Sequence, residues 1–85
     1  MILADQIREY AFNRYIKPVR HANSVVPYVV SIVSGDIVRE MKLVNRIPAV
    51  CGALDARKFQ NHYGLKLRSR SGPRQGMTAR WQFLC

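Results

Sequence analysis

The chain has 85 residues, which is enough for one small domain, residues 1–85, and excludes a large enzyme architecture. Hydrophobic residues make up 48% of the sequence and charged residues 22%, and these values exclude a compositionally disordered chain. Fourteen Lys and Arg against five Asp and Glu give a formal net charge of +9, which predicts a polyanionic partner.

The two cysteines, Cys51 and Cys85, do not have the spacing of a metal site and are too few for a disulfide framework. They favour a reducing, cytoplasmic setting, and we expect neither a metal nor a cofactor. The longest nearly apolar run, residues 25–33, is too short to cross a bilayer. The N-terminus carries Asp5 and Glu9 where a signal peptide has basic residues, so the sequence predicts no membrane partner.

The first predicted elements are a helix and a strand. Apolar residues recur at intervals of three and four over residues 3–16, which predicts an amphipathic helix. Pro18 is expected to kink or end this helix near Ile16, because a proline ring clashes with the preceding helical turn. Residues 25–33 are strongly β-branched, which predicts a strand, and Pro27 favours an edge position for it. One face of this strand is expected to hold Val26, Tyr28, Val30 and Ile32.

Two short helices are predicted next, separated by a tight turn at residues 42–45. Ser34 is expected to cap the first helix, which begins near Gly35. Asn45 is expected to cap the second, and Pro48 lies in its first turn, where a missing backbone donor costs nothing. The second helix has an apolar stripe of Ile47, Val50, Cys51 and Leu54 and an opposite face of Arg46, Ala49, Gly52, Ala53 and Arg57.

The end of the second helix is left open by the sequence. Phe59 lies off the apolar stripe, so the helix either runs unbroken to Tyr63 or restarts at Asp55. Gly64 is expected to end it in either case. Four aromatic residues in this half of the chain could stack on the unpaired bases of a nucleic acid: Phe59, Tyr63, Trp81 and Phe83. Three of the four fit better in the hydrophobic core.

The last twenty residues predict a β-hairpin with its turn at residues 71–76, because apolar side chains alternate there with polar or basic ones. The apolar face is expected to hold Leu65, Leu67, Met77, Ala79, Trp81 and Phe83. The basic face is expected to hold Lys66, Arg68, Arg70, Arg74 and Arg80. No acidic residue follows Leu65, whereas a face that only keeps a protein soluble is normally mixed in sign, so a binding role is favoured.

A helix, a strand, two short helices joined by a tight turn and a basic hairpin follow one another in this sequence. This is the element order of a winged helix-turn-helix domain. We therefore predict an α+β fold with a three-helix core, a small antiparallel β-sheet and a C-terminal basic β-hairpin as the wing.

Four segments also carry a resemblance to known proteins: Gly35-Asp36-Ile37, residues 45–54, Lys58-Phe59 and Gly72-Pro73-Arg74-Gln75-Gly76. They resemble small winged-helix proteins and domains that occur mainly in archaea and often have no assigned function. The resemblance covers roughly residues 35–77, about half of the chain. It implies the winged-helix fold and DNA binding, and it implies neither catalytic residues nor a target sequence.

In such a fold the recognition helix, near residues 46–57, enters the major groove, and the wing, residues 65–84, follows phosphates or a narrow minor groove. The contacts expected from the recognition helix are Asn45, Arg46, Ala49, Gly52, Ala53 and Arg57. Those expected from the wing are Lys66, Arg68, Arg70, Arg74, Gln75 and Arg80. The small Gly52 and Ala53 fit either close approach to DNA or close packing against another helix, and this alternative stays open.

The sequence thus predicts a protein that binds double-stranded DNA, either sequence-specifically or generally, as a transcriptional regulator or an accessory DNA-binding factor associated with the nucleoid. It contains no nucleophile motif and no phosphate-binding loop, so we expect neither catalysis nor a small-molecule ligand. Two alternatives are a winged-helix module for protein–protein interaction and an RNA-binding protein. A homodimer formed through the first helix and the strand at residues 25–33 is also left open.

Overall fold

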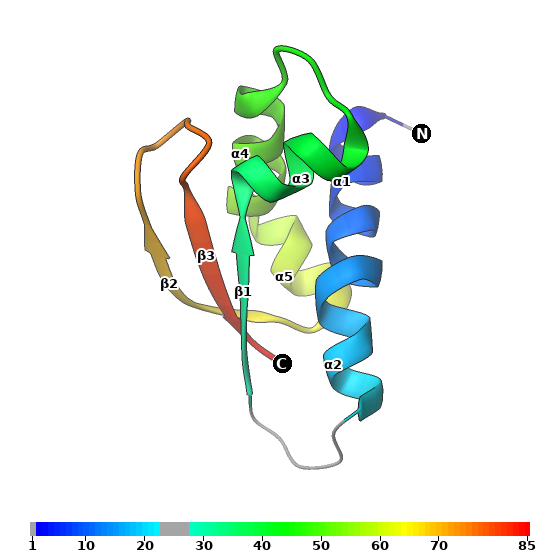
Figure 1. Ribbon diagram of the computed structural model, residues 1–85. Helices are drawn as coiled ribbons and strands as arrows, with labels where there is room; N and C mark the ends of the chain where they lie inside the picture. The colour runs from blue at the N-terminus through cyan, green and yellow to red at the C-terminus, as the bar shows by residue number, and fades with distance from the viewer. Residues whose placement is uncertain (1, 23–27) are drawn as a thin grey trace.

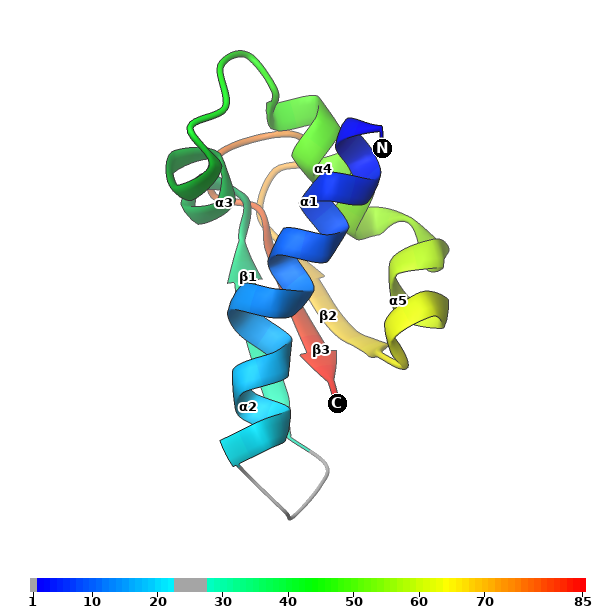
Figure 2. The ribbon, with the colours of Figure 1, turned by 90° about the vertical axis from the view of Figure 1, so that its right-hand side faces the viewer.

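Helices and strands follow one another in a small α+β fold with a three-stranded antiparallel sheet (Figures 1 and 2). The computed structural model describes residues 2–22 and 28–85. In chain order the elements are α1 (Leu3–Ala11), the π-helical turn η1 (Phe12–Ile16), α2 (Lys17–Ala22), β1 (Val29–Val33), α3 (Ser34–Met41), α4 (Ile47–Asp55), α5 (Arg57–Tyr63), β2 (Lys66–Ser71) and β3 (Arg80–Leu84). The predicted α+β class with an antiparallel sheet is confirmed.

The first helical segment is longer than predicted. α1, η1 and α2 follow one another without a break as far as Ala22, so of the two predicted effects of Pro18 the end of the helix near Ile16 is wrong, and a kink there stays a prediction. Pro18 is the second residue of α2, so only Lys17 separates it from the π-helical turn. A π turn is wider than an α turn, and this widening accommodates a proline ring that clashes in a regular helix.

The sheet has the strand order β1-β3-β2, and β1 is an edge strand as predicted. β1 pairs with β3 along its whole described length. Val30 and Ile32 are buried against the helices, whereas Val29 and Ser31 are exposed, which confirms the predicted alternation. The beginning of the predicted strand, residues 25–27, lies outside the described residues.

Both predicted helix caps are wrong. Val33 is the N-cap residue of α3, and the hydroxyl of Ser34 donates to the carbonyl of Gly76 instead of capping the helix. Arg46 is the N-cap residue of α4, and no side chain caps this helix. Asn45 has a positive φ of 55°, a conformation that Asn tolerates better than most residues, so it shapes the turn between the two helices.

α4 ends at Asp55, and the alternative of two helices is the one observed. Ala56 has extended backbone angles, φ −68° and ψ 133°, and α5 begins at Arg57. The break explains why Phe59 lies off the stripe of α4 and is nevertheless fully buried. α5 ends at Gly64 as predicted, with a φ of 65° in the left-handed region that glycine adopts readily.

The core lies between the helices and the sheet and is built around β3 (Figure 2). Trp81 and Phe83 on β3 and Phe59 on α5 have no exposed surface, while Tyr63 is half-buried, so the prediction of three core aromatics is confirmed. Phe59 meets Phe83 edge-on with ring centroids 5.3 Å apart. The stripe of α4 is also buried or half-buried, as predicted. Each fully buried apolar side chain contributes about 1.5–3 kcal/mol to folding.

The hairpin is present, but β3 is shorter than the sequence alternation predicts. It begins at Arg80, and Met77 is 42% exposed in the preceding turn instead of facing the core. Ala79 is fully buried just before the strand. Residues 72–79 therefore form a loop between the strands, which we name the β2–β3 loop.

Candidate nucleic-acid interface

A β-bulge in β2 determines which basic side chains face outward. The register with β3 shifts between Leu67 and Ser69, so the two-residue alternation breaks at Arg68. The side chain of Arg70 is consequently only 20% exposed, and its guanidinium carbon lies 4.9 Å from the centre of the Trp81 ring. The prediction that Arg70 shares an outer face with its basic neighbours is wrong.

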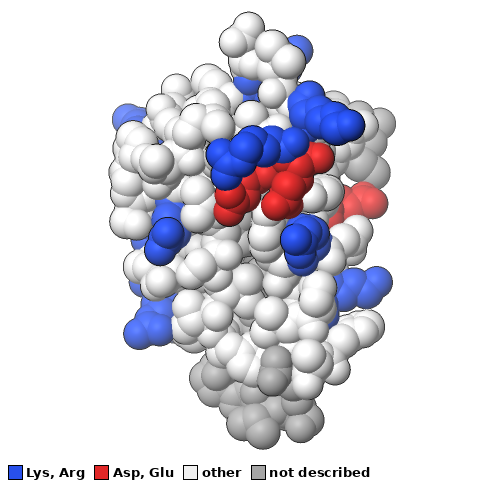
Figure 3. Space-filling view, viewed as in Figure 1, with Lys and Arg blue, Asp and Glu red and all other residues white. Residues whose placement is uncertain are grey.

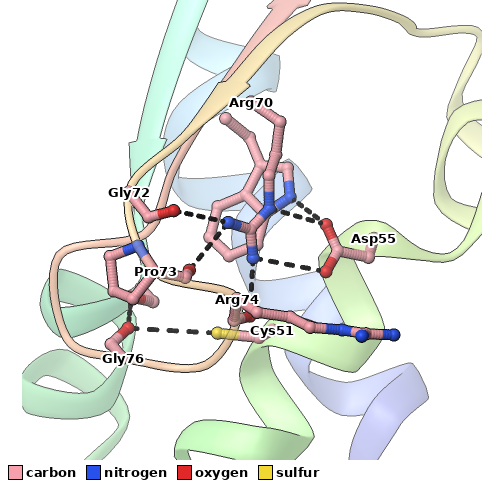
Figure 4. A network of polar contacts seen from close by, with 9 residues as sticks. Cys51, Asp55, Arg70, Gly72, Pro73, Arg74 and Gly76 are labelled. Carbon is pink, nitrogen blue, oxygen red and sulfur yellow. Dashed lines mark hydrogen bonds and ion pairs between the residues drawn. The ribbon is translucent and has the colours of Figure 1, made fainter.

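The guanidinium of Arg70 is surrounded by acceptors (Figure 4). Nε and Nη2 donate to the two carboxylate oxygens of Asp55, at 3.2 and 3.4 Å. Nη1 donates to the carbonyls of Gly72, at 3.3 Å, and Pro73, at 2.7 Å, and Nη2 also donates to that of Arg74, at 2.7 Å. Three consecutive backbone carbonyls at the beginning of the β2–β3 loop therefore accept hydrogen bonds from one side chain, and these bonds hold the backbone of Arg74 in place.

Asp55 joins α4 to both strands of the hairpin. Its Oδ1 accepts a hydrogen bond from the indole N–H of Trp81, at 2.7 Å, in addition to the bond from Arg70. Because Asp55 is the last residue of α4, these bonds connect the end of that helix to the beginning of the β2–β3 loop. This role of Asp55 was not predicted, although Asp55 is the single acidic residue among residues 43–85.

The far end of the β2–β3 loop is bound to α3 and α4. The backbone N–H of Gly35 donates to the carbonyl of Met77 at 2.9 Å. A Cβ atom on Gly35 would lie 2.6 Å from that oxygen, so only glycine permits this approach. The carbonyl of Gly76 accepts from the hydroxyl of Ser34 and lies 3.9 Å from Sγ of Cys51. Both ends of the loop are thus attached to the helices.

The carboxylates of the protein are mostly neutralised within the fold. Among the residues described, every acidic side chain except Glu9 takes part in an ion pair. The pairs are Arg8–Asp5, Lys58–Asp5, Arg14–Glu40, Arg39–Asp36 and Arg70–Asp55. Arg20 donates instead to the backbone carbonyls of Tyr63 and Gly64. The acidic side chains seen in Figure 3 lie over α3 and α1.

The other cations are exposed and have no carboxylate partner within residues 2–22 and 28–85. They are Lys17, Lys42, Arg46, Arg57, Lys66, Arg68, Arg74 and Arg80. Apart from Lys17 on α2, they lie in the turn before α4, at the beginning of α5 and on the hairpin. Over the hairpin, at the left of Figure 3, Lys and Arg appear without acidic neighbours. Such uncompensated charges are suited to neutralising phosphates.

Four of the six predicted recognition-helix residues lie at the surface around α4, and the other two do not belong to this exposed face. Those that are exposed or half-exposed around α4 are Asn45, Arg46, Ala49 and Gly52. Ala53 is only 2% exposed, because α1 packs against this side of α4 and Arg8 donates to the Ala53 carbonyl at 3.3 Å. The prediction that Ala53 faces DNA is therefore wrong. Arg57 lies on α5, beyond the break, so the predicted helix at residues 46–57 is not continuous.

Gly52 lies on the exposed side of α4 and has open space around it. A Cβ atom added there would meet nothing within 4 Å. Close packing against a neighbouring helix, one of the two explanations offered by the sequence, is therefore wrong for Gly52, whereas it is the one observed for Ala53. The fold makes no demand for a glycine at this position, and the other explanation, close approach of a ligand to the helix, stays a prediction.

The remaining predicted wing residues are all exposed. Arg74 and Gln75 lie in the β2–β3 loop and Arg80 begins β3, whereas Lys66 lies at the end of β2 away from the loop. Lys42, an exposed residue with a φ of 56° in the turn before α4, was not among the predicted contacts. The turn itself is the signal that points to it, because a residue between two helices is normally free to face a ligand.

Within the residues described, no three His, Cys, Asp or Glu side chains are grouped so that they could bind a metal ion. The helices in this part of the chain include none with both the length and the apolar character needed to cross a bilayer. Comparison of the chain with known protein families, curated proteins and solved structures yields no match.

Proposed function

We propose that the chain binds double-stranded DNA as a winged helix-turn-helix domain, in which α3 and α4 are the helix-turn-helix and the β2–β3 hairpin is the wing. The order of helices and strands along the chain supports this proposal, and so does the sheet order β1-β3-β2. The recognition helix of this proposal is α4, Ile47–Asp55, which is shorter than the sequence predicts.

The observation that carries the proposal is the set of exposed cations around α4 and on the hairpin that have no carboxylate partner in the part of the chain that the structure describes. Arg46 precedes α4, Arg68 lies on β2 and Arg74 lies in the β2–β3 loop. α4 is bound to this loop region through Asp55 and Cys51, so the charges belong to one connected framework. A duplex lying across both elements would neutralise several of them and release its counterions, which favours binding at low salt.

The parts of this surface have different expected roles. The N-terminal end of α4 offers Asn45, Arg46 and backbone N–H groups to the major groove and to the phosphates beside it. Arg74, whose backbone is held by Arg70, is expected to reach a phosphate or a narrow minor groove, where the negative potential attracts Arg. Regulation of transcription and association with the nucleoid are the roles we infer for such a protein.

The proposal is tested by fluorescence-anisotropy titration of a labelled duplex at several salt concentrations. Arg68→Ala and Arg74→Ala should each weaken binding and make the salt dependence shallower, by about 0.9 in the log–log slope for each lost phosphate contact. Lys17→Ala is the matched control, because it also removes one exposed, unpaired cation but lies on α2. Its slope should equal that of the unmodified protein. Arg70 is left intact because it holds the loop.

Single-stranded DNA and duplex RNA serve as competitors in the same titration. A preference for duplex DNA supports the proposal, whereas a preference for either competitor overturns it. The proposal also fails if no duplex binds at low salt, or if Lys17→Ala lowers the affinity as much as Arg74→Ala does. In the first of these cases an acidic protein becomes the partner to test.

A further inference from the structure

We infer that the chain binds duplex DNA with little discrimination between sequences, because α4 presents almost no side chain that can hydrogen-bond to a base edge. This inference rests on the proposed function and specifies its ligand: duplex DNA of arbitrary sequence, recognised by charge and shape.

The exposed face of α4 consists of small or apolar residues. Pro48 and Gly52 are exposed and Ala49 is half-exposed, and none of these side chains has a hydrogen-bond donor or acceptor. Direct readout in the major groove depends on donors and acceptors such as those of Arg, Asn, Gln and Glu. The middle of this helix therefore offers only van der Waals contacts to the groove.

The one polar residue on this face is already occupied. Asp55 is exposed in part, but both of its carboxylate oxygens accept hydrogen bonds from Arg70, and Oδ1 also accepts from Trp81. Reading a cytosine amino group would require breaking these bonds and would also release the beginning of the β2–β3 loop. Asp55 is thus a positioning residue of the interface and is unsuited to base recognition.

Gly52 points to close contact between helix backbone and ligand. The fold leaves open space where its Cβ would be, and glycine disfavours the helix compared with alanine. A helix without a side chain at this point can approach the floor or wall of a groove more closely. Such an approach depends on the width of the groove more than on the identity of its bases.

The polar side chains nearest to the entrance of α4 are the ones best placed to reach base edges, while Lys42 lies further back in the same turn. Asn45 and Arg46 are exposed and come immediately before the helix. One bidentate contact discriminates between bases by about tenfold to a hundredfold, so these two residues can specify no more than a step of about two base pairs. The cations of the hairpin act either on phosphates, which is independent of sequence, or on the potential of a narrow minor groove, which depends on the shape of the duplex and involves no base edge.

The test is selection from a duplex library with a randomised centre, followed by anisotropy measurements on a panel of AT-rich, GC-rich and scrambled duplexes of equal length. We expect an enriched motif of at most about two base pairs and affinities that agree within about a hundredfold across the panel. An enriched motif of four or more base pairs, or a preference of about a thousandfold for one duplex, overturns the inference and leaves the proposed function intact. Absence of binding to every duplex overturns the proposed function itself.

A second measurement tests the close approach at Gly52. Gly52→Gln should lower the affinity for all duplexes in the panel by the same factor, while circular dichroism shows an unchanged fold, because Gly52 is exposed and a Cβ atom there meets nothing within 4 Å. Lys17→Gln is the control for a substitution to glutamine elsewhere on the surface. The inference is contradicted if Gly52→Gln leaves the affinity unchanged or alters it for some duplexes only.

Discussion

At the scale of single residues, Arg70 shows how a side chain expected to bind a ligand can serve the fold instead. Its guanidinium donates to one carboxylate and to three backbone carbonyls, and it lies over the indole of Trp81. Only a planar group with several donors in a fixed geometry satisfies all these acceptors at once. The charge of Arg70 is therefore used to order the β2–β3 loop from which Arg74 extends.

Arg70→Lys should destabilise the protein by about 2 kcal/mol, because a lysine leaves several acceptors of the loop unsatisfied. Urea unfolding followed by tryptophan fluorescence measures this change, since Trp81 is the single tryptophan and lies in the core. Arg68→Lys is the matched control: Arg68 is exposed and unpaired, so the change should stay within about 0.5 kcal/mol. Equal effects of the two substitutions would show that the Arg70 contacts do not stabilise the loop.

Two glycines should respond to alanine in opposite directions. Gly52→Ala should stabilise the protein by about 0.5–1 kcal/mol, because alanine favours the helix and its Cβ meets open space. Gly35→Ala should destabilise it, because the new Cβ would lie 2.6 Å from the Met77 carbonyl oxygen. Thermal unfolding of the two variants in parallel measures both effects. A stabilising Gly35→Ala would mean that the loop is free to move away from α3.

At the scale of elements, α3 is joined to the first helical segment by one carboxylate. Glu40 accepts hydrogen bonds from the hydroxyls of Tyr10 on α1 and Tyr15 on η1, each at 2.7 Å, and Arg14 lies 3.8 Å away. Partial burial raises the pKa of Glu40, but the hydrogen bonds from Tyr15 and Tyr10 and the nearby charges of Arg14 and Arg39 lower it more. The pKa of Glu40 therefore lies below its ordinary value of 4.5.

The lowered pKa of Glu40 determines how the free energy of unfolding changes with pH. The contribution of Glu40 is fully present above pH 4.5, the value in the unfolded chain, and is lost as the pH falls through the folded-state pKa. We expect the thermal midpoint to fall in that acidic range and Glu40→Gln to reduce the fall. The effect should be modest because the carboxylate is partly exposed. Glu9→Gln, a control outside the ion pairs, should leave the acid-induced fall unchanged; a reduction as large as that of Glu40→Gln would contradict the assignment.

At the scale of the whole molecule, the dominant feature is excess positive charge. The net charge is +9, and the ion pairs account for most of the acidic groups, so the remaining cations repel one another across a small surface. Exposed ion pairs contribute little to stability, about 0–1 kcal/mol each. Repulsion among unpaired cations should therefore outweigh attraction within the pairs.

Salt should consequently stabilise the free protein while it weakens binding to DNA. Raising sodium chloride from about 20 to about 200 mM shortens the screening length and should raise the thermal midpoint of the free protein. The same change should lower the affinity for a duplex, because counterion release becomes less favourable. Differential scanning fluorimetry and anisotropy in matched buffers measure the two trends. A midpoint that falls with salt would show that the ion pairs outweigh the repulsion.

The sequence by itself determined the succession of elements, the core aromatics and the sign of the surface. These features depend on local patterns: the spacing of apolar residues gives the buried stripe of α4, and alternation gives Val30 and Ile32 their inward direction. Net charge follows from composition alone. The break at Ala56 was also foreseeable as one of two alternatives, because Phe59 does not fit the stripe.

Only the tertiary structure decided which of the predicted site residues and caps serve the fold and which remain exposed. A bulge in β2 turned Arg70 toward Trp81, contact with α1 buried Ala53, and the approach of the β2–β3 loop redirected the hydroxyl of Ser34 from the helix end to Gly76. Each outcome depends on a neighbour that is distant in sequence, so no local pattern contains it. The same long-range contacts left the other cations of the hairpin free, and this selection is what defines the candidate interface.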